Sequence, residues 1–135
     1  MIFETEGAIP FRSLLGIDRI EAAGGRAVLS LPLKPELGNR FGAVHGGALA
    51  TLVDAAMADA IITCLSGDDR VGGTIEMSLR FIAPVQGDMR AEARTLRVGG
   101  RIAFAQAEVF DAGGALVAAA QGSFLVRRGV KRSAP

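Results

Sequence analysis

The apolar positions between Leu49 and Ile61 follow the period of an α-helix. They fall at Leu49, Leu52, Val53, Ala56, Met57, Ala60 and Ile61, a spacing that gives a helix one apolar stripe. We expect this helix to end near Cys64 to Gly67, because Gly67 can adopt the left-handed conformation that commonly closes a helix. Asp54 lies on the flank of the stripe, so its carboxylate is expected at the boundary of the core.

Much of the remaining chain alternates with the period of two that is typical of β-strands. The clearest case is the stretch 74–82, where apolar residues alternate with the polar residues Thr74, Glu76, Ser78 and Arg80, so that one face is expected to be buried. Further strands are predicted at residues 17–21, 26–33, 88–98, 101–110 and 115–127, with a short helical turn at 10–15. One long helix with five to six antiparallel strands predicts an α+β fold in which the sheet wraps the helix.

The composition is that of one compact domain. The chain has 135 residues, half of them apolar, with 18 glycines and neither Trp nor Tyr. This length allows one core, so we predict a single domain over residues 1–135 with frayed tails at 1–9 and 129–135. The acidic start MIFETEGAIP is unlike a secretory signal, and no apolar run reaches the length of a membrane span. We therefore expect a cytoplasmic protein with no membrane partner.

Charge and cysteine content exclude several classes of function. Fifteen Lys and Arg residues against 14 Asp and Glu leave a net charge of +1, which gives no reason to expect a nucleic-acid partner. Cys64 is the only cysteine, so an intramolecular disulfide is excluded, and one Cys with one His cannot form a typical zinc site. Cys64 and His45 lie at opposite ends of the predicted helix, which also excludes a Cys/His dyad.

The segment before the helix combines the only histidine with several glycines. His45 is followed by Gly46 and Gly47 and preceded by Gly42, so backbone N–H groups can approach a ligand closely where the helix begins. Unpaired N–H donors and the helix dipole stabilise an anion or a developing oxyanion at such a position. A lone histidine is more often structural, but its place between this turn and the helix favours a functional role.

This stretch resembles the signature of a known family. Asn39, then His45-Gly46-Gly47, then Asp54 is similar to the motif of the hotdog-fold acyl-CoA thioesterases, in particular the phenylacetate-degradation, PaaI-like branch. The resemblance continues in the stretch 73–84, which is similar to the family's next strand and its aromatic-x-x-Pro turn. It implies a hotdog fold, with one long central helix wrapped by an antiparallel sheet.

The resemblance also implies an activity. It implies a thioesterase that hydrolyses an aryl- or medium-chain acyl-CoA to the carboxylic acid and free coenzyme A, with coenzyme A as part of the substrate and no other cofactor. The Gly46 N–H would polarise the carbonyl, and Asp54 would act as general base or nucleophile. His45 and Asn39 would orient the thioester and the water, with help from Thr74. In the family, Asp54 faces His45 and Gly46 of a neighbouring subunit, which implies a homodimer, often paired into a homotetramer.

The acyl group and the function itself leave alternatives open. We expect substrate contacts from Gly47, Phe41, Met57 and Phe81, although the directions of these side chains cannot be set from sequence. One alternative is a noncatalytic protein that binds acyl-CoA or an aromatic ligand, and another is a hotdog dehydratase acting on acyl thioesters. The first is disfavoured by the joint presence of Asn39, His45, Gly46, Asp54 and Thr74. The second is disfavoured by the spacing between the HGG motif and Asp54.

Overall fold

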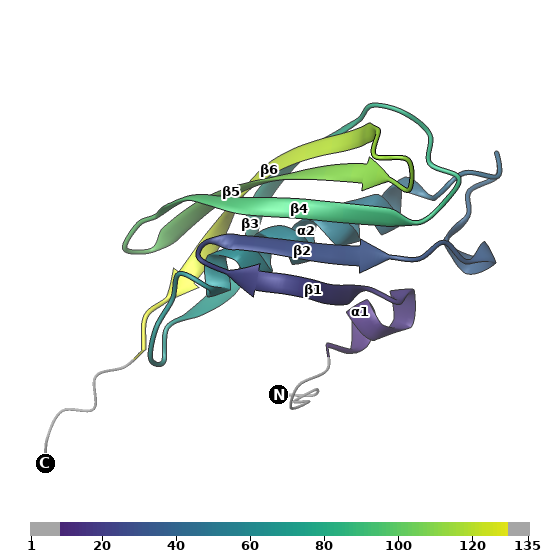
Figure 1. The fold of residues 1–135 in the computed structure, drawn as a ribbon. Helices are drawn as coiled ribbons and strands as arrows, with labels where there is room; N and C mark the ends of the chain where they lie inside the picture. The colour runs from purple at the N-terminus through teal and green to yellow at the C-terminus, as the bar shows by residue number, and fades with distance from the viewer. Residues whose placement is uncertain (1–8, 130–135) are drawn as a thin grey trace, which may run out of the picture.

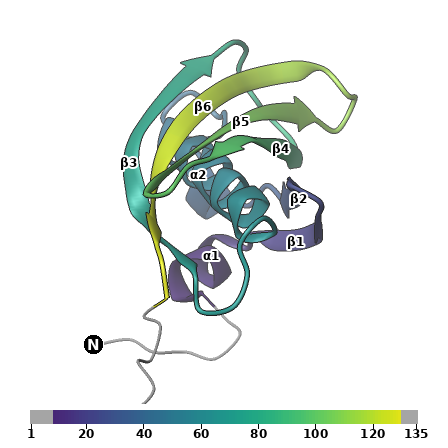
Figure 2. The same cartoon turned by 90° about the vertical axis from the view of Figure 1, so that its left-hand side faces the viewer.

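The computed structural model describes residues 9–129. Six strands form one antiparallel sheet in the order β1-β2-β4-β5-β6-β3, and the long helix α2, Gly46–Ile62, packs against one face of it (Figure 1). Figure 2 shows that the sheet curves around α2, with β3 at one edge and β1 at the other. This confirms the predicted α+β fold, in which an antiparallel sheet wraps one central helix.

The elements agree closely with those expected from the sequence. They are α1 Pro10–Leu15, β1 Asp18–Ala23, β2 Arg26–Leu31, a 3₁₀ turn at Pro35–Leu37, α2 Gly46–Ile62, β3 Arg70–Phe81, β4 Met89–Val98, β5 Ile102–Asp111 and β6 Leu116–Arg127. None of the helices in this part of the chain is long and apolar enough to span a bilayer.

The end of α2 differs from the sequence-based prediction. The helix stops at Ile62 with Thr63 as its cap, and Gly67, with φ 62°, lies in the loop that follows. Thr63 Oγ1 donates to Ala60 O at 2.7 Å and accepts a hydrogen bond from Gly25 N at 2.7 Å. These side-chain hydrogen bonds occupy the last turn and link it to the β1–β2 hairpin, so no left-handed residue closes the helix.

Burial of α2 extends beyond the predicted stripe. Ten of its 17 residues are buried, including Ala48 and Ala55 outside that stripe, because the curved sheet contacts the helix from several directions. Burial of large side chains such as Leu52, Met57 and Ile61 stabilises the fold by roughly 1.5–3 kcal/mol each. The facing strands supply buried alanines, at Ala91, Ala93, Ala103, Ala105 and Ala107, which let the helix lie close to the sheet.

A β-bulge changes which residues of β3 face the helix. The register with β6 shifts just after Thr74: Thr74 pairs with Phe124, whereas Met77 pairs with Gly122. Phe124 and Gly122 are both buried, so Thr74 and Met77 lie on the helix side, while Ile75 is 54% exposed. The predicted alternation is therefore wrong at Thr74 and Ile75, because the bulge inserts one extra residue into the strand.

A buried ion pair joins the N-terminal elements to α2. Asp59 has a side chain that is 0% exposed, and Arg12 Nη1 donates to both of its carboxylate oxygens at 2.9 Å. Arg19 Nε donates to Oδ2 of the same carboxylate at 3.0 Å. Arg12 is itself largely buried, with 17% of its side chain exposed, whereas Arg19 is 54% exposed. The sequence does not indicate this pairing, because the two partners lie 47 residues apart.

Replacing Arg12 with Met should cost much more stability than replacing Arg19 with Met. Arg12→Met leaves a buried carboxylate with one partly exposed partner, for which we expect a loss of about 3 kcal/mol in the free energy of unfolding. Arg19→Met removes an exposed partner and should cost about 1 kcal/mol or less. Urea denaturation of the two variants and the wild type measures both values, and equal losses would contradict the assignment of Arg12 as the principal partner.

The end of β6 is tied to the loop between α2 and β3. Of the predicted frayed tails, residues 1–8 and 130–135 lie outside the described part of the chain. Gly129 N donates to Asp69 Oδ1 at 2.7 Å, and Arg128 Nη1 donates to Oδ2 at 2.8 Å. The hydrogen bond from Gly129, followed by that from Arg128, lowers the pKa of Asp69 below its ordinary value of 3.8.

This lowered pKa predicts how Asp69 contributes to stability as pH changes. Its contribution should be complete above the unfolded value of 3.8 and should disappear as pH falls through the lower folded pKa. We therefore expect Asp69→Asn to be less stable than the wild type at neutral pH, with the difference closing in strong acid. Urea denaturation across this pH range tests the expectation, with Asp68→Asn as the control because Asp68 is exposed and makes no side-chain hydrogen bond within residues 9–129. A difference that stays constant in acid would contradict it.

Candidate active site

Asn39 shapes the loop that leads into α2. Its Oδ1 accepts hydrogen bonds from Phe41 N at 2.9 Å and Ala43 N at 3.1 Å, while Gly42, with φ 78°, turns the chain back. Its side-chain Nδ2 has no acceptor within residues 9–129. The same side chain can therefore hold the loop and donate a hydrogen bond to a ligand.

His45 caps the start of α2. Its Nδ1 accepts a hydrogen bond from Gly47 N at 2.8 Å, which satisfies one of the free donors at the helix end. Because Nδ1 accepts, a neutral ring carries its proton on Nε2, and the exposed side chain can donate that proton to a ligand. A Cβ at position 47 would lie 3.0 Å from Nδ1, so Gly47 leaves the room that this cap needs.

Gly46 offers an unpaired N–H at the same helix end. Its N–H has no hydrogen-bond acceptor in the described range 9–129, and it lies at the positive end of the helix dipole. The ring of Phe81 lies close beside it, since a Cβ at position 46 would be 3.2 Å from two ring carbons. This donor, next to an aromatic wall, can stabilise negative charge that develops on a carbonyl oxygen.

A mainly apolar cavity of about 340 Å³ opens beside Gly46. It lies open to solvent between the loop that precedes α2 and the segment after β3, which are joined by a hydrogen bond of 2.8 Å from Val44 N to Val85 O. Its walls are Asn39, Ala43, Val44, Gly46, Leu49, Phe81, Ile82, Ala83, Pro84 and Val85. Sequence reasoning did not predict Val44, Leu49 or Val85 at the site, because their approach depends on how the two segments pack.

Asp54 and Thr74 form a second group farther along the helix. Thr74 Oγ1 donates to Asp54 Oδ1 at 2.5 Å. The bulge in β3 makes this contact possible, because it turns Thr74 toward α2. Thr74 is part of β3, which is one edge strand of the sheet (Figure 2), and Asp54 remains partly exposed. A carboxylate held in this way, with access to solvent, can accept a proton from water or attack an electrophile.

The predicted catalytic residues therefore form two separate groups. Asn39, His45 and Gly46 lie at the start of α2, whereas Asp54 and Thr74 lie about 12 Å farther along the axis, at about 1.5 Å per residue. One thioester carbonyl cannot contact both groups of the same chain. A site that used both groups would therefore be incomplete within one protomer.

Residues 41–118 match the thioesterase superfamily. The human acyl-coenzyme A thioesterase 13 is 30% identical over 112 residues, which are 80% of this chain and 79% of that protein. The chain belongs to the thioesterase superfamily.

Solved structures of relatives share the fold. A conserved protein from Pseudomonas aeruginosa is 35% identical with a TM-score of 0.84, covering 89% of this chain and 95% of that one. A mutant of the phenylacetic acid degradation protein PaaI from Thermus thermophilus is 26% identical with a TM-score of 0.78, covering 87% and 97%. These matches confirm the hotdog thioesterase resemblance, and the chain is a thioester hydrolase.

The four residues predicted to bind substrate lie in three different places. Gly47 and Phe81 lie with the first group, beside Gly46. Phe41 lies on the loop with 80% of its surface exposed. Met57 is completely buried in the core, where its Cε lies close to Gly122.

Metal ligands do not gather in the part of the chain that the structure describes. Residues 9–129 contain no group of three or more His, Cys, Asp or Glu side chains that could hold a metal ion. The absence of a resident cofactor stays a prediction of the sequence.

Proposed function

We propose that this thioesterase hydrolyses acyl-CoA thioesters at a site shared between two copies of the chain. The proposal rests on the separation of two groups of polar residues along α2. The free N–H of Gly46 and His45 lie at the helix start, and Asp54 with Thr74 lies about 12 Å away. An antiparallel arrangement of two such helices brings the first group of one chain to the second group of the other. Two equivalent sites then form in a homodimer.

The β3 edge is the surface that would join the two copies. It is one edge of the sheet, so its outer backbone groups can pair with a second β3 and extend the sheet. Ile75, Phe81 and Ile82 on and after this strand are 54%, 58% and 53% exposed, respectively, and would be covered by the partner. Asp54 and Thr74 lie beside this edge, so pairing there places them at the interface.

The proposed reaction follows from the groups that the dimer brings together. The Gly46 N–H donates to the thioester oxygen and stabilises the negative charge that develops there. Asp54 of the other chain takes a proton from water, whose oxygen attacks the carbonyl carbon, or attacks that carbon itself and is then released by water. The C–S bond breaks, coenzyme A leaves as the thiol after taking up a proton, and the acyl group leaves as the acid.

The other polar groups would orient the reactants. The Nε2–H of His45 and the free Nδ2 of Asn39 are donors beside Gly46 that can hold the thioester or the water. Thr74 fixes the Asp54 carboxylate by its hydrogen bond, so that the second oxygen of Asp54 faces the substrate. This arrangement limits the motion of the reacting groups before the reaction.

We infer that the acyl group of the substrate is an aryl or a medium-chain group. About 340 Å³ lined mainly by apolar side chains lies directly beside Gly46, where the carbonyl would bind. The names of two relatives, an acyl-coenzyme A thioesterase and a phenylacetic acid degradation protein, support acyl-CoA as substrate and an aryl group as one candidate. The cytoplasmic location expected from the sequence stays a prediction.

Asp54→Asn should remove most of the activity while leaving the fold intact. The change keeps the size of the side chain and the oxygen that accepts from Thr74, but removes the charge needed for a base or nucleophile. We expect kcat/KM to fall by about 100-fold or more, measured as thiol release from aryl-CoA and from short- to long-chain acyl-CoA substrates.

Asp18→Asn is the matched control, since Asp18 is exposed on β1 and makes no side-chain hydrogen bond within residues 9–129. Full activity of Asp54→Asn would reject the role of this residue. Binding of the substrates by the wild type without thiol release would instead favour a noncatalytic binding protein.

Mixing two inactive variants tests whether the site is shared. Gly46→Pro removes the N–H at the first position of a helix, where the backbone tolerates proline. Its Cβ also displaces the Phe81 ring slightly, and Asp54→Asn removes the carboxylate. A mixed dimer contains one site with both defects and one with neither, so random assortment should restore about one quarter of the wild-type activity. The two variants are unfolded together, refolded and assayed for thiol release. Activity no greater than the mean of the two parents would show that each chain carries its own site.

A further inference from the structure

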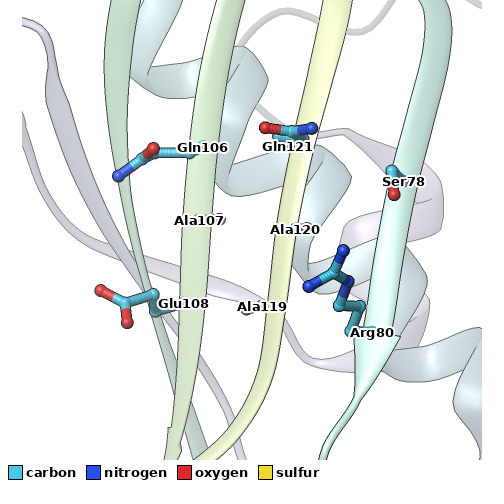
Figure 3. Close-up of a pocket in the computed structure, with 8 residues that line it drawn as sticks. All are labelled: Ser78, Arg80, Gln106, Ala107, Glu108, Ala119, Ala120 and Gln121. Carbon is cyan, nitrogen blue, oxygen red and sulfur yellow. The ribbon is translucent and has the colours of Figure 1, made fainter.

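Two hollows of similar volume differ in the chemistry of their walls. The first, of about 290 Å³, lies on the outer face of the sheet, opposite α2, and its walls include the polar side chains of Arg80, Gln106, Glu108 and Gln121 (Figure 3). The second is the cavity of about 340 Å³ beside Gly46, whose walls are mainly apolar. An uncharged acyl group is stabilised by burial against apolar surface. The cavity beside Gly46 is therefore the one suited to an acyl group.

The walls of this cavity range from exposed to buried. Phe81 and Ile82 are more than half exposed and stand at its open side. Val44, Leu49 and Val85 line the same cavity, yet they are only 5%, 4% and 2% exposed. A side chain that borders a cavity and is nevertheless almost completely buried lies at its inner end. These three side chains therefore close the cavity toward the core.

Backbone hydrogen bonds fix the separation of the segments around the inner end. Val44 N donates to Val85 O at 2.8 Å, which joins the loop before α2 to the segment after β3. The next residue of the loop, His45, donates from its backbone N to Leu37 O at 2.6 Å. Because the backbone is tied on both sides, the depth of the cavity is set by the side chains that fill its inner end.

Leu49 lies on α2 one helical turn after Gly46. Residues three apart in an α-helix share a face, and each Cα–Cβ bond tilts toward the N-terminus of the helix. The Leu49 side chain therefore leans back toward the turn that carries the free N–H of Gly46, which agrees with its place in the cavity wall. Leu52 and Val53 follow it along the helix and are completely buried.

The size of coenzyme A sets the direction in which an acyl group enters. Coenzyme A is much larger than a cavity of about 340 Å³, so the part of the substrate beyond the sulfur stays outside. When the thioester oxygen accepts from the Gly46 N–H, the acyl carbons on the other side of the carbonyl run toward the inner end. Leu49 is the α2 side chain that lines this end.

We propose that Leu49 closes the acyl pocket and sets the largest acyl group that this thioesterase hydrolyses. The inference rests on the proposed function, since it requires that the Gly46 N–H binds the thioester oxygen. An acyl group that ends before Leu49 is held by apolar contacts. A longer group must displace a side chain that is packed in the core, which is costly because protein interiors are dense. Leu49 thus selects the substrate by its volume and takes no part in bond making.

Shortening Leu49 should lengthen the acyl group that the enzyme accepts. Thiol release gives kcat/KM for benzoyl-CoA and for straight-chain acyl-CoA substrates of increasing length, with the wild type, Leu49→Ala and Leu49→Val. We expect the longest chain that is hydrolysed efficiently to grow by about three carbons in Leu49→Ala and by about one in Leu49→Val, the numbers that the side chain loses. For the first chain that is too long for the wild type, kcat/KM relative to a short chain should rise roughly tenfold or more in Leu49→Ala.

Leu52→Ala is the matched control. It removes the same atoms from a completely buried position of the same helix, but Leu52 is not part of the cavity wall. It should lower the stability without changing the order of the substrates. Ratios of kcat/KM between substrates do not depend on the amount of folded enzyme, so variants of different stability can be compared, and Leu49→Val serves if Leu49→Ala fails to fold.

The outcomes separate this inference from the proposed function. Thiol release with the wild-type chain-length profile in the Leu49 variants would overturn the role of Leu49 and leave the thioesterase proposal standing. A shift of the same size in Leu52→Ala would also overturn it, because the effect would then come from a general loosening of the core. No thiol release by the wild type from any of these substrates would overturn both proposals.

Discussion

The enclosure of α2 by the curved sheet is the constraint on which the rest of the structure depends. Buried alanines on both surfaces bring the helix close to the strands, and the larger side chains of Leu52, Met57 and Ile61 fill the core. Because the helix is held along its length, its first turn and the side chain of Asp54 have fixed positions relative to the β3 edge. The candidate chemistry is arranged along this one rigid element.

The start of α2 shows how local structure provides a binding group. His45 satisfies the N–H of Gly47, Asn39 organises the preceding loop, and the N–H of Gly46 remains unpaired. A side chain at position 46 would press against Phe81, so a glycine keeps both the donor and the aromatic wall. The second group depends instead on the bulge in β3, which turns Thr74 toward Asp54. In the proposed reaction the two groups complement each other, and they are too far apart to act on one carbonyl within one chain.

The two faces of the sheet have different surroundings. The inner face packs on α2 and supports the proposed hydrolytic site, whereas the outer face faces away from the helix (Figure 2). Inside the fold, the Asp59 carboxylate is fully buried, and Arg12 and Arg19 compensate its charge.

The amino-acid sequence by itself determined the long helix, all six strands, the α+β fold class and the residues of the HGG motif with Asp54, because hydrophobic period and glycine position are local properties. Tertiary structure decided the features that depend on contacts between segments far apart in the chain, which local sequence patterns do not contain. The bulge at Thr74 depends on pairing with β6, the partners of Asp59 depend on contacts across 47 residues, and the burial of Met57 depends on how far the sheet wraps the helix. The distance between Gly46 and Asp54 follows from the rigid helix, whereas the walls of the cavity beside Gly46 are set by the packing of segments far apart in the chain.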